Sequence, residues 1–292
     1  MNTDEIAVAF ECGGNALIGV IHKPEKPASR GVLAIVAGGP QYRGGCCRQL
    51  VSMARAFADK GFPVMRFDHT GLGDSSGEYL GYEHFAPDLD AAISEFKKAV
   101  PELEEVVLWG GCNAASAALI HGPYRSDVTG MILSNPWVHT DELHARVLAK
   151  HYYWSRLKDR NFWKKVFSLK FDFISSLKSF LVTQIKARKK SPQKKPDETK
   201  DDNTDNSSDH FTDRMLSGAS RFQGRILLLV SGLSIVSKEL DELMSSSREW
   251  KAALQKQTVS RVDFPDADQT FATLKERHKQ INESLKWLMS WH

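Results

Sequence analysis

The chain has 292 residues, of which 41% are hydrophobic and 26% are charged, and its formal net charge is +3. These values are ordinary for a soluble globular protein, and the length suits one large α/β domain with an insertion. Much of the positive excess comes from residues 156–195, which lie in no recognisable nucleic-acid-binding module, so we expect no nucleic-acid partner.

Strands and helices are predicted to alternate along most of the chain. Apolar runs bounded by Gly, Pro or polar clusters predict strands at residues 6–12, 17–22, 31–37, 63–68, 106–109, 129–134, 225–231 and 259–264. Helical segments are predicted at residues 48–60, 86–100, 114–120 and 270–291. The first two strands form a hairpin, and the alternation that follows predicts an α/β fold with a doubly wound, mostly parallel sheet. Ligands of such sheets bind beyond the carboxyl ends of the strands.

The alternation stops at residues 137–222, which we interpret as a helical cap inserted into a core made of residues 1–136 and 223–292. Residues 187–210 have almost no apolar side chains and are predicted to be a disordered linker within the cap. The aromatic residues of the cap favour a small helical core. Lys and Arg beside Trp and Tyr also fit peripheral contact of the cap with a membrane surface.

The chain has four cysteines, Cys12, Cys46, Cys47 and Cys112. Their spacing contains no Cys-x-x-Cys pair and no disulfide or metal framework, which favours a reducing compartment and predicts no metal site. Residues 1–10 lack the apolar run of a signal peptide, and residues 171–185 are too short and too polar to span a bilayer. The sequence therefore predicts a soluble, cytoplasmic protein.

Cys112 is the centre of the most informative motif. An apolar strand runs into the sequence Gly-Gly-Cys-Asn-Ala at residues 110–114, and a helix-forming run follows at once. This pattern predicts a nucleophile elbow, which exposes one side chain at the end of a central strand, with Cys in the usual place of Ser. The alternative is that Cys112 is a small buried hydrophobic residue, but that reading does not explain the small residues on both sides.

Five segments together carry a family resemblance: residues 38–43 (GGPQYR), 67–75 (FDHTGLGDS), 108–116 (LWGGCNAAS), 135–138 (NPWV) and 267–271 (ADQTF). With them the chain resembles the α/β-hydrolase superfamily and, more narrowly, the exosortase A system-associated hydrolase 1 family. The resemblance implies an α/β-hydrolase fold and a Cys-dependent enzyme that needs no cofactor. It also implies an association with exopolysaccharide production and protein sorting in Gram-negative bacteria.

The resemblance assigns roles to individual residues. Cys112 matches the nucleophile, and the backbone N–H of Asn113 matches one donor of the oxyanion hole. A second donor comes from the loop at residues 38–43. Because Pro40 has no N–H, we expect Gln41 to supply this donor, with Gly39 as the second choice.

The acid and base positions depart from the family pattern. Ser234 stands where the family has Asp, and Gln269 stands where it has His. A Gln side chain cannot take up a proton near neutral pH, so it cannot act as a general base. Without a base, a thiol with a pKa of about 8.5 is only slightly ionised at neutral pH.

Three other residues are candidate substitute bases. His69 follows a predicted central strand on the active-site side of the sheet, and it is the first candidate. His139 lies at the entrance of the cap. Asp268 is adjacent to the vacant His position, but a carboxylate is a weak base for a thiol.

Two functions from different classes remain open at the level of sequence. The first is an ester or thioester hydrolase in which Cys112 attacks the acyl carbonyl of a small-molecule substrate. The second is a catalytically degenerate hydrolase-fold protein that binds an acyl or glycolipid ligand, or a protein partner, without turnover. The sequence gives no indication of the oligomeric state.

Overall fold

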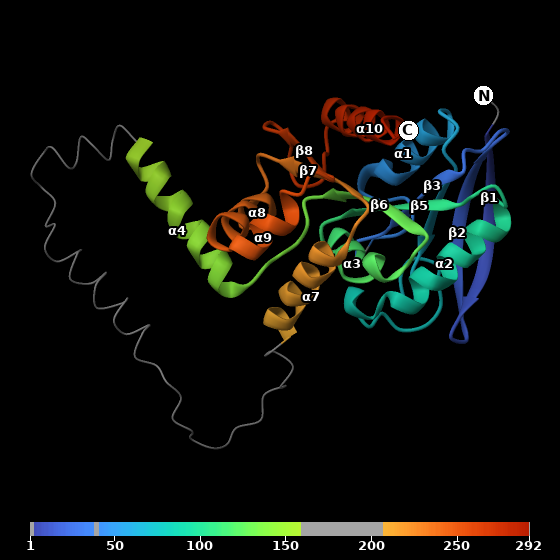
Figure 1. The fold of residues 1–292 in the computed structure, drawn as a ribbon, viewed down its shortest axis with the longest axis horizontal. Helices are drawn as coiled ribbons and strands as arrows, with labels where there is room; N and C mark the ends of the chain where they lie inside the picture. The colour runs from blue at the N-terminus through green and yellow to red at the C-terminus, as the bar shows by residue number, and fades with distance from the viewer. Residues whose placement is uncertain (1–2, 38–40, 159–206, 292) are drawn as a thin grey trace, which may run out of the picture. The chain divides into compact units, whose positions relative to one another are not determined.

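The computed structural model describes residues 3–37, 41–158 and 207–291 (Figure 1). The predicted linker at 187–210 falls almost entirely outside these ranges, and only its last residues, from Ser207 on, are described, as the start of a helix. No helix in the described ranges combines the length and the apolarity needed to cross a bilayer.

The described strands form one sheet of eight, in the order β1-β2-β4-β3-β5-β6-β7-β8. Their bounds are Thr3–Cys12 (β1), Asn15–Pro24 (β2), Arg30–Ile35 (β3), Val64–Asp68 (β4), Glu105–Gly111 (β5), Val128–Ser134 (β6), Arg225–Ser231 (β7) and Val259–Phe264 (β8). The pairs β1–β2 and β2–β4 are antiparallel, and all other neighbours are parallel. The predicted hairpin and the mostly parallel sheet are thus confirmed.

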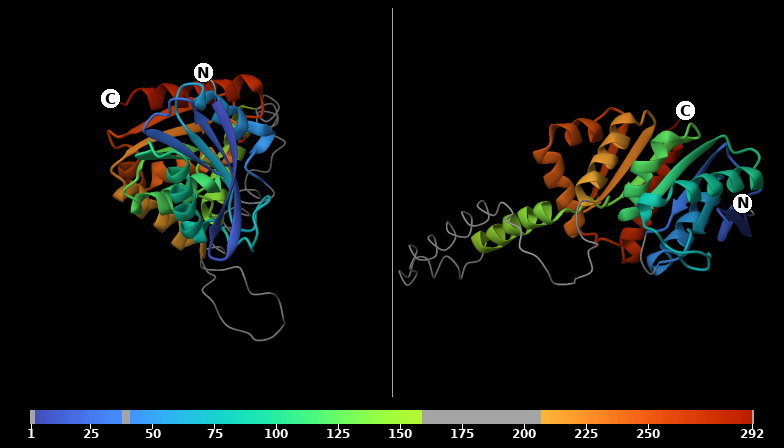
Figure 2. Two further views of the ribbon diagram at one scale, coloured as in Figure 1. Left: turned by 90° about the vertical axis from the view of Figure 1, so that its right-hand side faces the viewer. Right: turned by 90° about the horizontal axis from the view of Figure 1, so that it is seen from below.

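Helices cover both faces of this sheet. The described helices are Cys46–Arg48 (η1), Gln49–Ala58 (α1), Tyr82–His84 (η2), Ala86–Ala99 (α2), Asn113–His121 (α3), Gly122–Tyr124 (η3), Asp141–Lys158 (α4), Ser207–Arg221 (α7), Ile235–Ser246 (α8), Arg248–Leu254 (α9) and Leu274–Met289 (α10). The apolar residues of α1 and α10 pack on one face of the sheet, and those of α2, α3, α7, α8 and α9 pack on the other (Figures 1 and 2).

The central strands are buried on both faces, which explains their continuous apolar sequences. All five residues of β4 are buried, as are six of the seven residues of β6. At the edge of the sheet, β8 alternates more and buries only Phe264 fully. The carboxyl ends of β5, β6 and β7 are therefore part of a sheet that is buried on both faces.

The chain divides into two compact units. The first consists of residues 1–143 and 207–292, and the second of residues 144–206. The first unit includes α7, which lies within the segment 137–222 predicted to be the cap. The physical reason is that Phe211, Met215 and Ala219, at helical spacing on α7, are buried in the core beside α3.

Candidate active site at the carboxyl end of β5

Cys112 lies at a sharp turn between β5 and α3. Its φ of 55° is in the left-handed region, which is unusual for a residue with a side chain. Gly110 permits this turn, because a Cβ at that position would lie 2.6 Å from the backbone of Ala114. The Cys112 N–H donates to the carbonyl of Ser134 at 2.9 Å. The strand, the strained residue and the helix have the geometry that an elbow requires, and the nucleophilic role of Cys112 stays a prediction.

A cavity of about 160 Å³ opens beside Cys112. Of the predicted site residues, Gln41, Asn113 and Gln269 line it together with Cys112. Gly39 lies outside the described residues. The described lining contains carboxamides, hydroxyls, thiols and apolar groups, and no histidine is among them.

Ser234, Gln269 and Cys112 form a chain of hydrogen bonds. The Ser234 hydroxyl, which lies at the N-cap of α8, donates to Oε1 of Gln269. The Gln269 side chain also interacts with Cys112 and lowers the pKa of its thiol. Because Oε1 accepts from Ser234, the group of the amide left to face the sulfur is its N–H. The structure thus brings the three residues together, and their catalytic positions stay a prediction.

The hydrogen bonds that link Ser234, Gln269 and Cys112 run in the direction opposite to those of a catalytic triad. In a triad the base accepts the proton of the nucleophile and donates to the acid. Here the hydroxyl donates to the amide oxygen and the amide N–H donates to the sulfur. Gln269 therefore stabilises charge on the sulfur without being able to remove its proton.

The pKa of Cys112 is above its ordinary value, because burial of the thiol outweighs the hydrogen bonds from the Asn113 backbone N–H and from the Gln269 side chain. The backbone N–H of Asn113 interacts with the Cys112 sulfur, and its part in an oxyanion hole stays a prediction. The thiol is therefore mostly protonated at neutral pH.

Asn135 organises the loops around this site, a role that the sequence analysis did not assign. This fully buried residue donates from Nδ2 to the backbone carbonyl of Gln269 at 3.0 Å. Its Oδ1 accepts from the Ser231 N–H at 2.9 Å and from the Ser237 hydroxyl at 2.7 Å. The residue thus fixes the loops after β7 and β8 to the end of β6. The available signal was a polar Asn-Pro pair directly after a buried strand.

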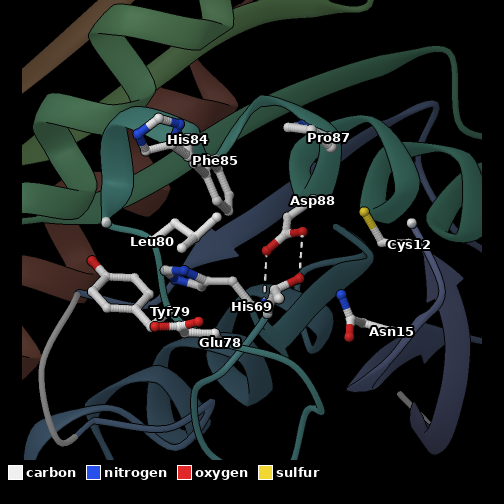
Figure 3. Close-up of a pocket in the computed structure, with 13 residues that line it drawn as sticks. Cys12, Asn15, His69, Glu78, Tyr79, Leu80, His84, Phe85, Pro87 and Asp88 are labelled. Atoms are coloured by element: carbon white, nitrogen blue, oxygen red, sulfur yellow. Dashed lines mark hydrogen bonds between the residues drawn. The ribbon is translucent and has the colours of Figure 1, made fainter.

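His69 does not line the cavity beside Cys112. The structure places its ring in a separate cavity, shown in Figure 3, with Tyr79, Phe85 and Asp88. Its Nε2 lies 2.6 Å from the carbonyl of Val36, and burial lowers its pKa. The prediction that His69 replaces the missing base therefore has no support from the geometry.

The other two candidate bases, Asp268 and His139, also interact with groups other than Cys112. Asp268 accepts hydrogen bonds from the N–H and hydroxyl of Thr270 and from the Ala272 N–H, and its pKa is lowered despite partial desolvation. His139 lies 3.1 Å from Glu239 and stacks on Trp137. Neither residue lines the Cys112 cavity.

The hydrogen bond from Gln269 has a measurable effect on Cys112. In the Gln269→Ala variant we expect the midpoint of the pH profile for iodoacetamide alkylation of Cys112 to move to higher pH, because a donor to the thiolate is lost. Peptide mass spectrometry between pH 6 and 10 follows each cysteine separately. An unchanged or lowered midpoint would show that the amide does not donate to the sulfur, and Gln257→Ala at an exposed site is the control.

Comparison with known proteins defines the family. The model of the family described as serine aminopeptidase, S33, matches residues 27–206, which is more than half of the chain. The chain belongs to this family of α/β-hydrolases. No curated protein matches the chain significantly in sequence.

Solved structures similar to this S33-family chain have the same fold at low sequence identity. An esterase from Pyrococcus furiosus superposes with a TM-score of 0.63 at 13% identity, covering 99% of this chain and 92% of the esterase. A dienelactone hydrolase from Anabaena variabilis superposes with a TM-score of 0.60 at 15% identity, covering 100% of this chain and 99% of that hydrolase. Est1E from Butyrivibrio proteoclasticus, with bound ferulic acid, superposes with a TM-score of 0.57 at 13% identity, covering 97% of this chain and 100% of Est1E. At such identities the likeness establishes the α/β-hydrolase fold of this S33-family chain and nothing finer.

Proposed function

We propose that this α/β-hydrolase family protein binds a small acyl ester or thioester beside Cys112 and does not turn it over efficiently. The observation that carries the proposal is that Gln269, which accepts from the Ser234 hydroxyl, lines the cavity beside Cys112, and that no histidine is among the described residues that line it. General-base assistance contributes typically 10²–10⁴-fold to the rate of such reactions. A site that keeps the cavity and lacks the base is suited to holding a carbonyl compound.

The donors in the site support an acyl ligand. The Asn113 N–H is directed at the Cys112 sulfur, and Gln41 lines the same cavity from the loop after β3. A carbonyl oxygen placed between these groups would be held as in an oxyanion hole. The sequence resemblance supports a ligand from exopolysaccharide or exosortase-linked metabolism. The four free thiols of the chain support a reducing compartment such as the cytoplasm.

A second candidate function is Cys112-dependent hydrolysis of activated esters or thioesters. It is favoured by two features: the strained turn presents the sulfur to the cavity, and two donors partly offset the effect of burial on its pKa. In this case Cys112 would act as an unassisted thiolate on substrates with good leaving groups.

One experiment separates the two functions. We expect the wild-type protein to bind S-butyryl-N-acetylcysteamine in an NMR titration, with shifts centred on the Cys112 and Asn113 amides, and to hydrolyse this thioester and p-nitrophenyl butyrate no faster than the Cys112→Ala variant. Cys47→Ala, at an exposed thiol, is the matched control. Turnover that disappears only in Cys112→Ala would establish the second function, and absence of binding would overturn the first.

A further inference from the structure

A second cavity, separate from that of Cys112, lies between the β1–β2 turn, the loop after β4 and the start of α2. Its volume is about 200 Å³. Figure 3 shows polar groups that line it: the carboxyl groups of Asp88 and Glu78, the imidazoles of His69 and His84, and the thiol of Cys12. The proposed acyl-binding role makes no use of this cavity.

The protonation state of His69 follows from its surroundings. A carbonyl oxygen can only accept, so the contact of Nε2 with the Val36 carbonyl places the proton on Nε2. The imidazole is only 3% exposed, and its lowered pKa keeps it neutral. No described residue hydrogen-bonds Nδ1. This nitrogen is therefore an available acceptor on a residue that lines the cavity.

Asp88 adds a buried acceptor to the same cavity. Its two oxygens accept from the Thr70 N–H at 2.7 Å and from the Thr70 hydroxyl at 2.8 Å, which leaves further lone pairs on each oxygen. The nearby Cys12 thiol is neutral, because burial and the hydrogen bond to Asp88 raise its pKa to about 11. Among the described residues that line the cavity, none is Lys or Arg.

The walls of the cavity are aromatic. The ring of His69 lies 4.9 Å from that of Phe85 and 6.1 Å from that of Tyr79, measured between centroids, and exposed Leu80 completes this side. The lining also contains the exposed His84 and no Lys or Arg, so its two carboxylates and the acceptor nitrogen favour a ligand that donates hydrogen bonds and carries positive charge. Aromatic faces also attract cations.

We propose that this cavity binds a small organic ammonium ion. Its N–H groups donate to Asp88 and to Nδ1 of His69, and its alkyl part lies against Tyr79, Leu80 and Phe85. Glu78 at the rim attracts the cation. The site is independent of Cys112 and its proposed acyl ligand.

The test is an NMR titration of the full-length, ¹⁵N-labelled protein with n-butylammonium chloride at constant ionic strength. We expect saturable shifts of the Cys12, Thr70 and Asp88 amides and a Kd at least tenfold lower than that of 1-butanol, with no saturable response to butyrate. Equal affinity for 1-butanol, or shifts located elsewhere, would overturn the proposal.

Variants locate the charge that binds the cation. Asp88→Asn keeps an oxygen acceptor for Thr70, and we expect it to raise the Kd for butylammonium at least tenfold, whereas Asp90→Asn, at an exposed position on the same helix, leaves it unchanged. Glu78→Gln, at an exposed position where folding is not at stake, should also raise the Kd. Cys112→Ala should bind with unchanged affinity. An unchanged Kd in both Asp88→Asn and Glu78→Gln would contradict the assignment.

Discussion

The double variant Ser234→Asp/Gln269→His is expected to hydrolyse p-nitrophenyl acetate with a kcat/KM at least about 10²-fold above that of the wild-type protein, the lower end of what a general base contributes. The imidazole would accept the Cys112 proton and donate to the new carboxylate, which restores the direction of a triad. The measurement is initial rates between pH 5 and 9, where activity should rise as the imidazole loses its proton.

The local structure favours this exchange. The backbone carbonyl of Gln269 is held by Asn135, so the loop does not depend on the side chain that is replaced. Ser234 caps α8 by accepting from the Ser237 N–H, and Asp is an equally good N-cap residue. Both substitutions therefore change the chemistry of the site and leave its supports in place.

Two controls make the result specific. Adding Cys112→Ala to the double variant should abolish the gained activity, and Gln257→His, which introduces a histidine at an exposed site, should give none. A folded double variant with no gain would show that the three side chains are not aligned for acyl transfer. That result would also weaken the proposal that an acyl carbonyl binds beside Cys112.

The Gly218→Ala variant is expected to lose about 2–3 kcal/mol of unfolding free energy, in the upper range for an overpacked core. Gly218 is at the contact between α7 and α3, and a Cβ there would overlap the backbone carbonyl of Leu119. Since the obstructing group is backbone, it cannot rotate away. Urea unfolding measured by circular dichroism gives the free energy.

The matched control for this variant is Ser217→Ala, at the exposed neighbouring position of the same helix. Its effect should stay within about 0.5 kcal/mol, as for most surface substitutions. If Gly218→Ala had no greater effect than Ser217→Ala, α7 would not pack closely on α3, and its assignment to the first compact unit would be wrong.

Much of the fold could be predicted from hydrophobic patterns. The buried strands were recognisable because they are continuously apolar, and the hairpin because Gly13 and Gly14 separate two strand-like runs. The helices α8 and α9 were not predicted, although Ser234 and Ser247 cap them. The placement of α7 could not be read from its sequence, since an amphipathic helix does not reveal which neighbour covers its apolar face.

The site could be predicted in part. The elbow pattern pointed to Cys112 and the family resemblance to Ser234 and Gln269, and the structure brings these three together. The position of His69 could not be derived in the same way. Its place after β4 puts it at the correct edge of the sheet, but only the fold shows that its Nε2 is bound to the Val36 carbonyl.

The hydrogen bond between Ser234 and Gln269 has a consequence for how the two positions can vary. A carboxylate at 234 would repel the amide oxygen that now accepts the hydroxyl. The amide would then turn over and present its oxygen to Cys112. Serine with glutamine directs an N–H at the sulfur and aspartate with histidine a basic nitrogen, whereas aspartate with glutamine would leave an amide oxygen that accepts from the thiol but cannot take its proton. In related chains the residues at positions 234 and 269 are therefore expected to change together. The residue at one of these positions then predicts whether the other position carries the acid or the base of a triad.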